Sequence, residues 1–477
     1  MGARVTRRDV VVGAAGALAL ATSVSDRVKA QQRKPNVLFI LADDLGYADV
    51  SCYGRREYAT TNIDRLAQGG MKFMHAYANS AVCSATRTAL ITGRYQYRYP
   101  LGLEEPLIMR DVGLALDVPT LPSLLKKAGY ATALIGKWHL GEPPKYGPQK
   151  SGYDRFYGFI PCCSDYFNHK DLLWDGSEKA DDNGYLTDLL ADRAATTVAE
   201  FARARTPFLI SLHFNAPHWP WEGPEDQEEA RRVTPPGGGG LIRLLHYDGG
   251  SLATYAKMVL AMDAAIGRVL TALERAGVAQ NTIVIFTSDN GGERYSDTWP
   301  FSGKKQELLE GGIRIPAIVR WPGQVRAGAT SNQTIMSMDW VPTLLAAAGA
   351  ASDPSSPPDG IDIGPQLKGA AAASRKLFWR YKYNVQQAMR DGGWKYLKIQ
   401  DNTFLFNVID DPLERANLKE RRRDIYDRMV AEWRAWDATM LPLDPNSFTS
   451  GFSGDVLADH IGAPTPPARG ALEGASR

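Results

Sequence analysis

The chain has 477 residues, of which 44% are apolar, 10% aromatic and 23% charged, and its formal net charge is +2. This composition excludes a disordered or collagen-like protein and allows two or three domains with a large core. The nearly balanced charge excludes the electrostatic footprint of a nucleic-acid-binding protein.

Residues 1–30 have the pattern of an export signal. Arg7 and Arg8 precede an apolar stretch at residues 10–21, and Val-Lys-Ala follows at residues 28–30. The apolar stretch is too short to span about 30 Å of hydrocarbon, which disfavours the alternative of a membrane anchor. The sequence therefore predicts a twin-arginine signal peptide and a periplasmic or secreted protein, with no membrane segment after signal removal.

Buried strands alternate with helices over residues 31–370. Continuous apolar runs of strand length lie at residues 36–42, 130–135, 207–213 and 282–287, and helical segments lie at residues 121–128, 186–203 and 254–276. This alternation predicts a doubly wound α/β sheet flanked by helices. Polar residues follow each run, at the carboxyl end of the strand, where such sheets bind their ligands.

A smaller unit of different character follows at residues 371–440. Short strand-like segments lie at residues 377–383, 387–390, 394–399 and 403–408, and a helical pattern covers residues 420–439. We therefore expect a C-terminal α+β subdomain made of a small antiparallel sheet and one helix. The tail, residues 441–477, is rich in Pro and Gly and is expected to be loosely ordered.

Two acidic pairs follow two of the predicted strands. Asp43 and Asp44 end the first, and Asp289 and Asn290 end the last. Oxygen ligands of this kind select a hard cation, Ca²⁺ or Mg²⁺. Taken singly, either pair could also be a helix cap or a turn.

Cys83 is separated from Arg87 by one helical turn, so the two side chains can share a helix face. Cys83 is then either a buried core thiol or a functional residue. Cys52, Cys162 and Cys163 fit the pattern of buried small hydrophobic residues, and one disulfide among them is the alternative.

The segment around Cys83 resembles the signature of type I sulfatases, in which Cys or Ser is followed by any residue, Pro or Ala, any residue and Arg. This chain has Ala85 where the commonest form of the motif has Pro. Further blocks resemble the same family in the same order, at residues 35–47, 136–141, 216–220, 287–292, 303–316 and 411–418. The resemblance covers about residues 35 to 440. It implies an alkaline phosphatase-like fold with a large mixed sheet and a sulfuric ester hydrolase activity.

The resemblance also implies a set of site residues. The metal ligands would be Asp43, Asp44, Asp289, Asn290 and the formylglycine made from Cys83. The residues around the sulfate would be Arg87, Lys137, His139, His218 and Lys305, where Lys305 is preferred to Lys304 because of its spacing from Glu310.

These residue types suit the hydrolysis of an anionic ester, because a cation and basic side chains stabilise the charge of the transition state. In the implied mechanism a hydroxyl of the hydrated formylglycine attacks sulfur, with Asp289 as the base. His218 or Lys305 protonates the leaving alcohol. His139 then deprotonates the second hydroxyl to expel sulfate, while Arg87 and Lys137 orient the hydrate.

The leading hypothesis is therefore a sulfatase that acts on a sulfated glycan or an aryl or alkyl sulfate. A formylglycine-generating enzyme would be its maturation partner. One alternative is a phosphonate or phosphate ester hydrolase of the same superfamily. The other is a catalytically silent binder of sulfated glycans, in which Cys83 remains a thiol.

Overall fold

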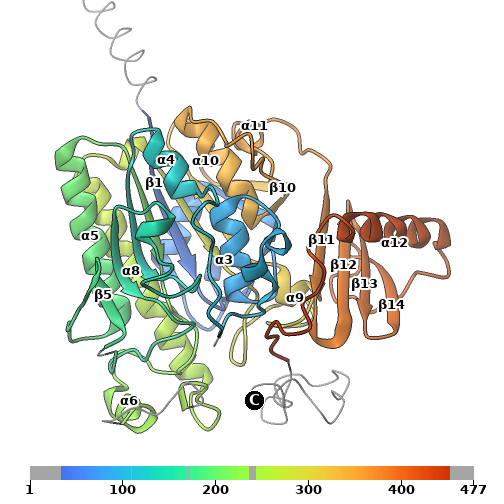
Figure 1. Ribbon diagram of the computed structural model, residues 1–477, viewed down its shortest axis with the longest axis horizontal. Coiled ribbons are helices and arrows are strands. Elements are labelled where there is room, and N and C mark those ends of the chain that lie inside the picture. The colour runs from blue at the N-terminus through green and yellow to red at the C-terminus, as the bar shows by residue number, and fades with distance from the viewer. Residues whose placement is uncertain (1–33, 109, 170, 236–242, 452–477) are drawn as a thin grey trace, which may run out of the picture.

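The computed structural model describes residues 34–108, 110–169, 171–235 and 243–451 (Figure 1). The predicted signal at residues 1–30 and the end of the tail at residues 452–477 lie outside the described residues. None of the helices in the described ranges has the length and apolar character that a membrane span requires.

A ten-stranded sheet lies at the centre of the described chain, in the order β10-β2-β9-β8-β1-β7-β3-β4-β5-β6. Strands β8, β1, β7, β3 and β4 are parallel, whereas β9 runs antiparallel to both β8 and β2. The predicted large mixed α/β sheet is thus confirmed. The strands are β1 (Asn36–Ala42), β2 (Met71–Tyr77), β3 (Ala131–Lys137), β4 (Arg155–Phe159), β5 (Leu173–Asp175), β6 (Glu178–Lys179), β7 (Phe208–His213), β8 (Thr282–Ser288), β9 (Ala317–Arg320) and β10 (Ala329–Met336).

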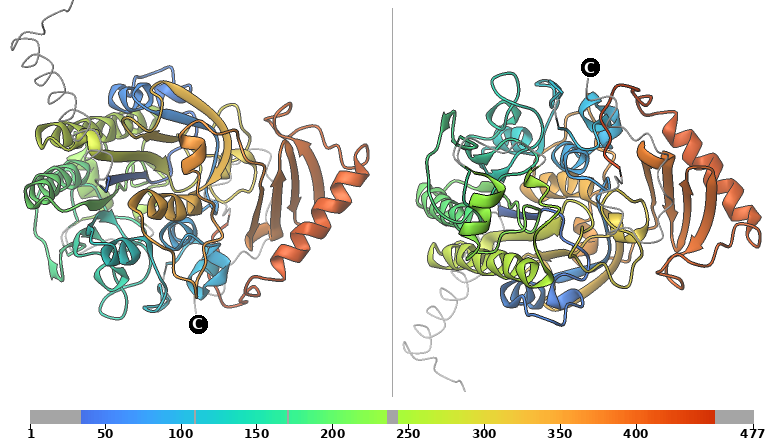
Figure 2. Two further views of the ribbon diagram at one scale, coloured as in Figure 1. Left: turned by 90° about the horizontal axis from the view of Figure 1, so that it is seen from above. Right: turned by 90° about the horizontal axis from the view of Figure 1, so that it is seen from below.

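Helices cover both faces of this sheet (Figure 2). One apolar cluster joins the sheet to α2, α5 and α8, and a second joins the other face to α3, α4, α10 and α11. The helices are α2 (Thr61–Gln68), α3 (Cys83–Thr92), α4 (Leu121–Lys127), α5 (Leu186–Ala204), α6 (Gln227–Val233), α8 (Leu252–Arg275), α9 (Glu310–Ile313), α10 (Trp340–Ala348), α11 (Gly364–Leu367) and α12 (Arg423–Asp437).

The burial of strand β1 explains why its residues after Asn36 are all apolar. All seven of its residues are buried, and successive side chains point to opposite faces of the sheet. Leu38 and Ile40 belong to the cluster of α5 and α8, whereas Phe39 packs edge-on against Trp340 of α10 at 6.2 Å between ring centroids. Because both faces are covered, residues 37–42 are all apolar, and the one polar residue, Asn36, starts the strand and donates to Thr282 Oγ1 at 3.4 Å.

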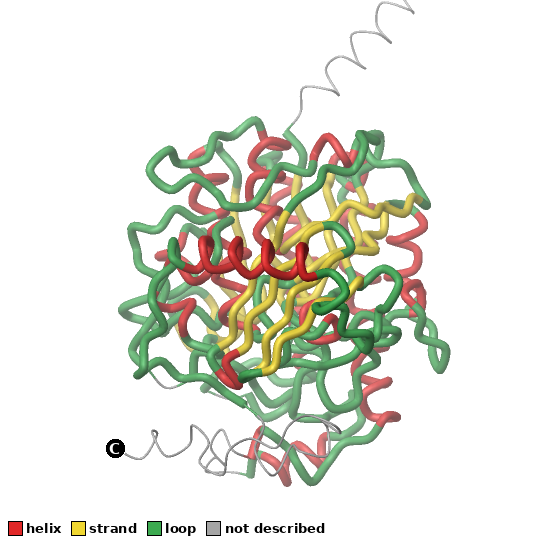
Figure 3. The backbone as a smooth tube through the Cα atoms, turned by 90° about the vertical axis from the view of Figure 1, so that its right-hand side faces the viewer, coloured by secondary structure: helices red, strands yellow, loops and turns green. Residues whose placement is uncertain are grey.

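The C-terminal unit is a four-stranded antiparallel sheet, β11 (Lys376–Tyr381), β12 (Gln386–Asp391), β13 (Trp394–Ile399) and β14 (Asn402–Asn407). Helix α12 lies across its outer face (Figure 3). Met429 and Trp433 of α12, one helical turn apart, pack against Met389 and Leu405 of the strands. The predicted small antiparallel sheet with one helix is confirmed, and residue 370 lies between α11 and β11.

Part of the tail packs on the protein. Thr449 forms a β-bridge with Glu105, and the backbone N–H of Phe448 donates to Glu104 Oε2 at 2.9 Å. Residues 441–451, which the composition led us to expect as loosely ordered, therefore include a segment docked beside the small sheet.

Glu105, beneath this docked segment, predicts a pH dependence of stability. Burial raises its pKa to about 8, although the N–H of Lys382 and the charge of Arg380 oppose the shift. The folded state thus binds a proton that the unfolded state releases near pH 4.5, so stability falls as the pH rises from about 4.5 to about 8. We expect Glu105→Gln to flatten the decline of the melting temperature over this window. Exposed Glu57→Gln is the control, and an unchanged slope in Glu105→Gln would contradict the assignment.

Candidate active site

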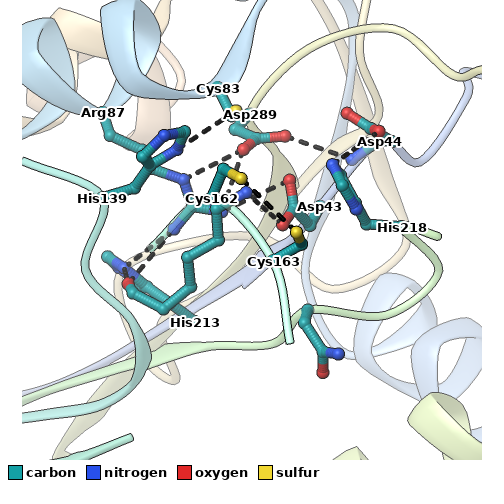
Figure 4. Close-up of polar contacts among 12 residues, drawn as sticks. Asp43, Asp44, Cys83, Arg87, His139, Cys162, Cys163, His213, His218 and Asp289 are labelled. Carbon is teal, nitrogen blue, oxygen red and sulfur yellow. Dashed lines mark hydrogen bonds and ion pairs between the residues drawn. The ribbon is translucent and has the colours of Figure 1, made fainter. Parts of the chain in front are cut away.

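Polar side chains converge where the carboxyl ends of β3, β7, β1 and β8 meet at one edge of the sheet (Figure 4). Each strand delivers its residues at its last position or just beyond it, as open α/β sheets do at ligand sites. Helix α3 adds Cys83 at its start and Arg87 one turn later, and the chain after β8 adds Lys305. All ten predicted site residues are brought together here and are at most 5% exposed: Asp43, Asp44, Cys83, Arg87, Lys137, His139, His218, Asp289, Asn290 and Lys305.

One carboxylate oxygen and one amide oxygen of this cluster accept no hydrogen bond from the described residues. Asp43 Oδ1 and Asn290 Oδ1 are buried without a hydrogen-bond partner among the described residues. The ligand atoms of Asp43, Asp289 and Cys83 lie within 4.8 Å of one another, and those of Asp43, Asp44 and His218 form a second such group. Buried carboxylates with free lone pairs fit a cation.

Three basic side chains are paired with these carboxylates. Lys137 Nζ lies 2.6 Å from Asp43 Oδ2, and Lys305 Nζ lies 2.6 Å from Asp44 Oδ2. Arg87 contacts Asp289 Oδ2 through both Nε at 3.0 Å and Nη2 at 2.9 Å. The basic charges are therefore held beside the acidic cluster, where an anionic substrate would need them.

Cys83 is the first residue of α3, a helix whose ten residues are all buried. Its Sγ lies 3.3 Å from His139 Nδ1, while His139 Nε2 donates to the carbonyl oxygen of Leu107 at 2.5 Å. Because Nε2 is the donor, Nδ1 is free to accept a proton from the side chain at position 83.

Backbone conformation helps to gather these side chains. Asp44 has φ of 61° and His139 has φ of 60°, both in the left-handed region that residues other than glycine seldom adopt. The N–H of Asp44 donates to Asp289 Oδ1 at 3.2 Å, which holds this conformation. Unfavourable backbone geometry of this kind is concentrated at functional sites.

Burial and charge shift the pKa values of the site in opposite directions. Burial alone would raise the pKa of Asp44, but the charges of Lys305 and Lys137 lower it to about 2. Burial and the neighbouring Asp43 raise the pKa of Asp289 to about 7, and burial raises that of the Cys83 thiol to about 12. Burial also lowers the pKa of His139 and His218 well below the usual value, so both imidazoles are neutral.

Two residues that contact this site, His213 and Trp219, were not among the predicted site residues. His213 Nδ1, at the end of β7, lies 3.4 Å from Arg87 Nη1 and 3.3 Å from the carbonyl oxygen of Lys137. The ring of Trp219 packs against His218, with 4.0 Å between centroids, and Lys305 Nζ lies 5.7 Å from its centre. The only sequence signal for His213 was its place at a strand end, whereas Trp219 lies in the block at residues 216–220 that resembles the family.

The remaining cysteines are free thiols, so the alternative of a disulfide is wrong in this structure. Cys162 Sγ and Cys163 Sγ lie 3.4 Å apart, and both residues are buried beside Val233 and Trp219. The prediction of buried small hydrophobic residues holds for these two, whereas Cys52 is half-buried.

Comparison with known proteins places the chain in a family. The family model described as Sulfatase matches residues 35–350, and that described as N-sulphoglucosamine sulphohydrolase, C-terminal, matches residues 301–434. N-acetylgalactosamine-6-sulfatase of Rattus norvegicus is 30% identical over 76% of this chain and 71% of the relative. Arylsulfatase A of Homo sapiens is 31% identical over 73% of this chain and 71% of the relative.

Solved structures agree. Ps i-CgsB in complex with k-i-k-neocarrahexaose has a TM-score of 0.78 and 29% identity, over 90% of this chain and 98% of that one. A phosphonate monoester hydrolase of Agrobacterium radiobacter shares the fold alone, at 22% identity and a TM-score of 0.59. Fold and site together define a hydrolase of the alkaline phosphatase-like superfamily. The chain belongs to the sulfatase family and is a sulfuric ester hydrolase.

Proposed function

We propose that the protein hydrolyses sulfate monoesters of a glycan through a formylglycine made from Cys83, with one Ca²⁺ ion bound by the acidic cluster. One observation carries the proposal: Cys83 Sγ lies among carboxylate oxygens of Asp43 and Asp289 that are within 4.8 Å of it. Carboxylates and basic side chains are costly to bury. Packing therefore does not explain why a cysteine is buried among them.

The cation would be held by Asp43, Asp44, Asp289, Asn290 and the modified side chain of residue 83. The two buried oxygens without hydrogen-bond partners, on Asp43 and Asn290, support this assignment. An all-oxygen donor set favours Ca²⁺, with Mg²⁺ as the alternative. When bound, the cation stabilises negative charge on the sulfate oxygens.

The modified side chain supplies the attacking hydroxyl, and the surrounding residues orient it and move protons. Arg87 and Lys137 orient residue 83, and the Asp289 carboxylate accepts the proton of the attacking hydroxyl. Lys305 Nζ donates a proton to the oxygen of the leaving alcohol; His218 could do so from Nε2 only once protonated, because its neutral ring has its single N–H at Nδ1, facing the carbonyl oxygen of Trp219 at 2.7 Å. His139 Nδ1, 3.3 Å from Cys83 Sγ, accepts the proton whose removal releases sulfate.

The substrate class rests on the relatives. One is named for N-acetylgalactosamine 6-sulfate chemistry, and one structure was solved with a neocarrahexaose. We therefore favour a sulfated glycan over an aryl or alkyl sulfate. The sequence of residues 1–30 supports twin-arginine export to the periplasm or beyond, after a formylglycine-generating enzyme has acted on Cys83.

The first experiment is mass spectrometry of the tryptic peptide of residues 73–87, from protein exported by its host. We expect an aldehyde or its hydrate at Cys83, with Ala85 tolerated in the modification motif. The same preparation is then assayed on matched aryl sulfate and aryl phosphate esters. A faster phosphate reaction would favour the phosphoester hydrolase, and binding without turnover by an unmodified thiol would favour the silent binder.

Removal of the cation gives a separate prediction. Without it, the carboxylates of Asp43, Asp44 and Asp289 repel one another, so a chelator should abolish turnover and lower the melting temperature. Calcium at about 100 times its dissociation constant should restore about 2.7 kcal/mol of stability. Asp289→Asn should remove most of this calcium-dependent shift, whereas Asp64→Asn, outside the cluster, should leave it unchanged. Equal shifts in both variants would contradict the assigned ligands.

A further inference from the structure

The segment that carries Lys305 is bound both to the large domain and to the C-terminal unit. The N–H of Lys305 donates to the carbonyl oxygen of Gly292 at 2.9 Å, and the N–H of Gln306 donates to that of Ala81 at 3.0 Å. Gln306 itself has φ of 73°, in the left-handed region. A residue other than glycine stays in this conformation only where its surroundings hold it.

Gln386, from the small sheet, holds Gln306 in this conformation. It is the first residue of β12 and is 2% exposed. Its Nε2 donates to the carbonyl oxygen of Gln306 at 2.9 Å, and its Oε1 accepts from the N–H of Leu308 at 2.8 Å. One side-chain amide thus binds the backbone on both sides of residue 307, directly after Lys305.

The same segment is bound to the small sheet at its far end. The N–H of Glu310 donates to Glu414 Oε2 at 2.6 Å, and Lys395 Nζ bridges Glu310 Oε1 and Glu414 Oε1 at 3.0 and 2.8 Å. Lys305 therefore reaches Asp44 from a segment held by both units, since the N–H groups of Gly291 and Ala78 in the large domain also donate to the carbonyl oxygens of Gly312 and Ile313.

We propose that Gln386 is a positioning residue for Lys305, through which the small sheet holds the ammonium group at its catalytic place. This inference rests on the proposed function, in which Lys305 faces the sulfate ester. Loss of the two Gln386 hydrogen bonds lets Gln306 relax from its left-handed conformation, and Lys305 Nζ then moves relative to Asp44. A displacement of about 1 Å at a catalytic group can cost about 100-fold in rate.

The test compares Gln386→Ala with Gln333→Ala. Gln333 is fully buried in β10, and its side-chain amide also both donates to and accepts from the backbone. Its Nε2 donates to the carbonyl oxygen of Ala373 at 3.2 Å, and its Oε1 accepts from the N–H of Ala373 at 2.7 Å. We expect both variants to lose similar thermal stability. Only Gln386→Ala should lose kcat on an aryl sulfate, by roughly 10- to 100-fold with KM little changed.

A second variant tests the backbone strain directly. Glycine adopts positive φ at little cost, so Gln306→Gly should recover about tenfold in kcat when combined with Gln386→Ala. Gln386→Glu keeps the acceptor for Leu308 and removes the donor to Gln306, so it should also lose kcat. Gln386→Glu takes the place of Gln386→Ala in the test if the alanine variant does not fold.

The Lys305→Ala variant distinguishes a failure of the positioning role of Gln386 from a failure of the proposed function. If it abolishes turnover while Gln386→Ala and Gln386→Glu keep wild-type kcat, the positioning role is wrong and the proposed function stands. If Lys305→Ala keeps full activity, the assignment of Lys305 in the proposed function is itself wrong. Equal loss of kcat in Gln386→Ala and Gln333→Ala, or no recovery with Gln306→Gly, would overturn the inference.

Discussion

We expect the Cys83→Ala variant to lose sulfate ester turnover by roughly 10⁵-fold or more in kcat/KM, the scale seen when a catalytic nucleophile is removed. Cys83 is 1% exposed, and its Sγ lies 3.3 Å from His139 Nδ1. Alanine removes only the sulfur, so the ion pairs of Arg87 and Lys137 with the carboxylates remain. The loss should therefore appear in the turnover of an aryl sulfate, measured by steady-state kinetics.

Cys52→Ala is the matched control for this change. Cys52 is also a free thiol, but its N–H donates to Asp64 and it takes no part in the acidic cluster. We expect it to retain wild-type kinetics after the same purification. Turnover by Cys83→Ala within tenfold of the wild type would rule out residue 83 as the nucleophile.

The α/β fold and the place of the oxygen ligands follow from local sequence, whereas the full set of site residues came from the family resemblance. The central residues of β1 and β8 are apolar because helices cover both faces of the sheet, and each strand is followed by two residues with carboxylate or amide side chains. Parallel strands bring their carboxyl ends to one edge, so residues 246 positions apart, Asp44 and Asn290, come within 2.7 Å. The sequence pattern predicts that they share this edge, and the pairing of β1 with β8 in the structure brings them into contact.

Other parts of the site depend on contacts that no local pattern encodes. Strand β9 runs antiparallel between β8 and β2, and nothing in its four residues specifies direction. Gln386 is an ordinary polar residue at the start of a strand, and its partners lie 80 and 78 positions away. The role proposed for Gln386 depends on the left-handed backbone of Gln306. The sequence gives no sign of this conformation, because residue 306 is not a glycine.

We expect Lys395→Met to be the most destabilising single substitution in the small sheet. Lys395 is fully buried between Glu310 and Glu414, both of which are also buried. Burial raises the pKa of Glu414 to about 7 even with Lys395 beside it, whereas Lys395 and Arg314 outweigh burial and lower that of Glu310. Methionine fills a similar volume but leaves two carboxylates with less compensation, which costs about 3–5 kcal/mol of unfolding free energy.

The deficit of Lys395→Met should depend on pH with a defined sign. Loss of the ammonium group raises the folded-state pKa of both carboxyls, so the variant binds more protons when folded than the wild type does. Its stability therefore falls more steeply as the pH rises, and the deficit in urea unfolding should be larger near about pH 8 than near about pH 5. Lys398→Met, on the same strand but only half-buried, should change stability by less than about 0.5 kcal/mol.

A second substitution separates charge from packing in this cluster. Glu414→Gln removes one of the two carboxylates that Lys395 compensates, while its amide oxygen can still accept from the N–H of Glu310. If the uncompensated charge causes the deficit, Lys395→Met combined with Glu414→Gln should be more stable than Lys395→Met alone, since the coupling between contacting residues is not additive. Equal or lower stability of the double variant would show that the lost packing of the lysine stem, and not charge, causes the deficit.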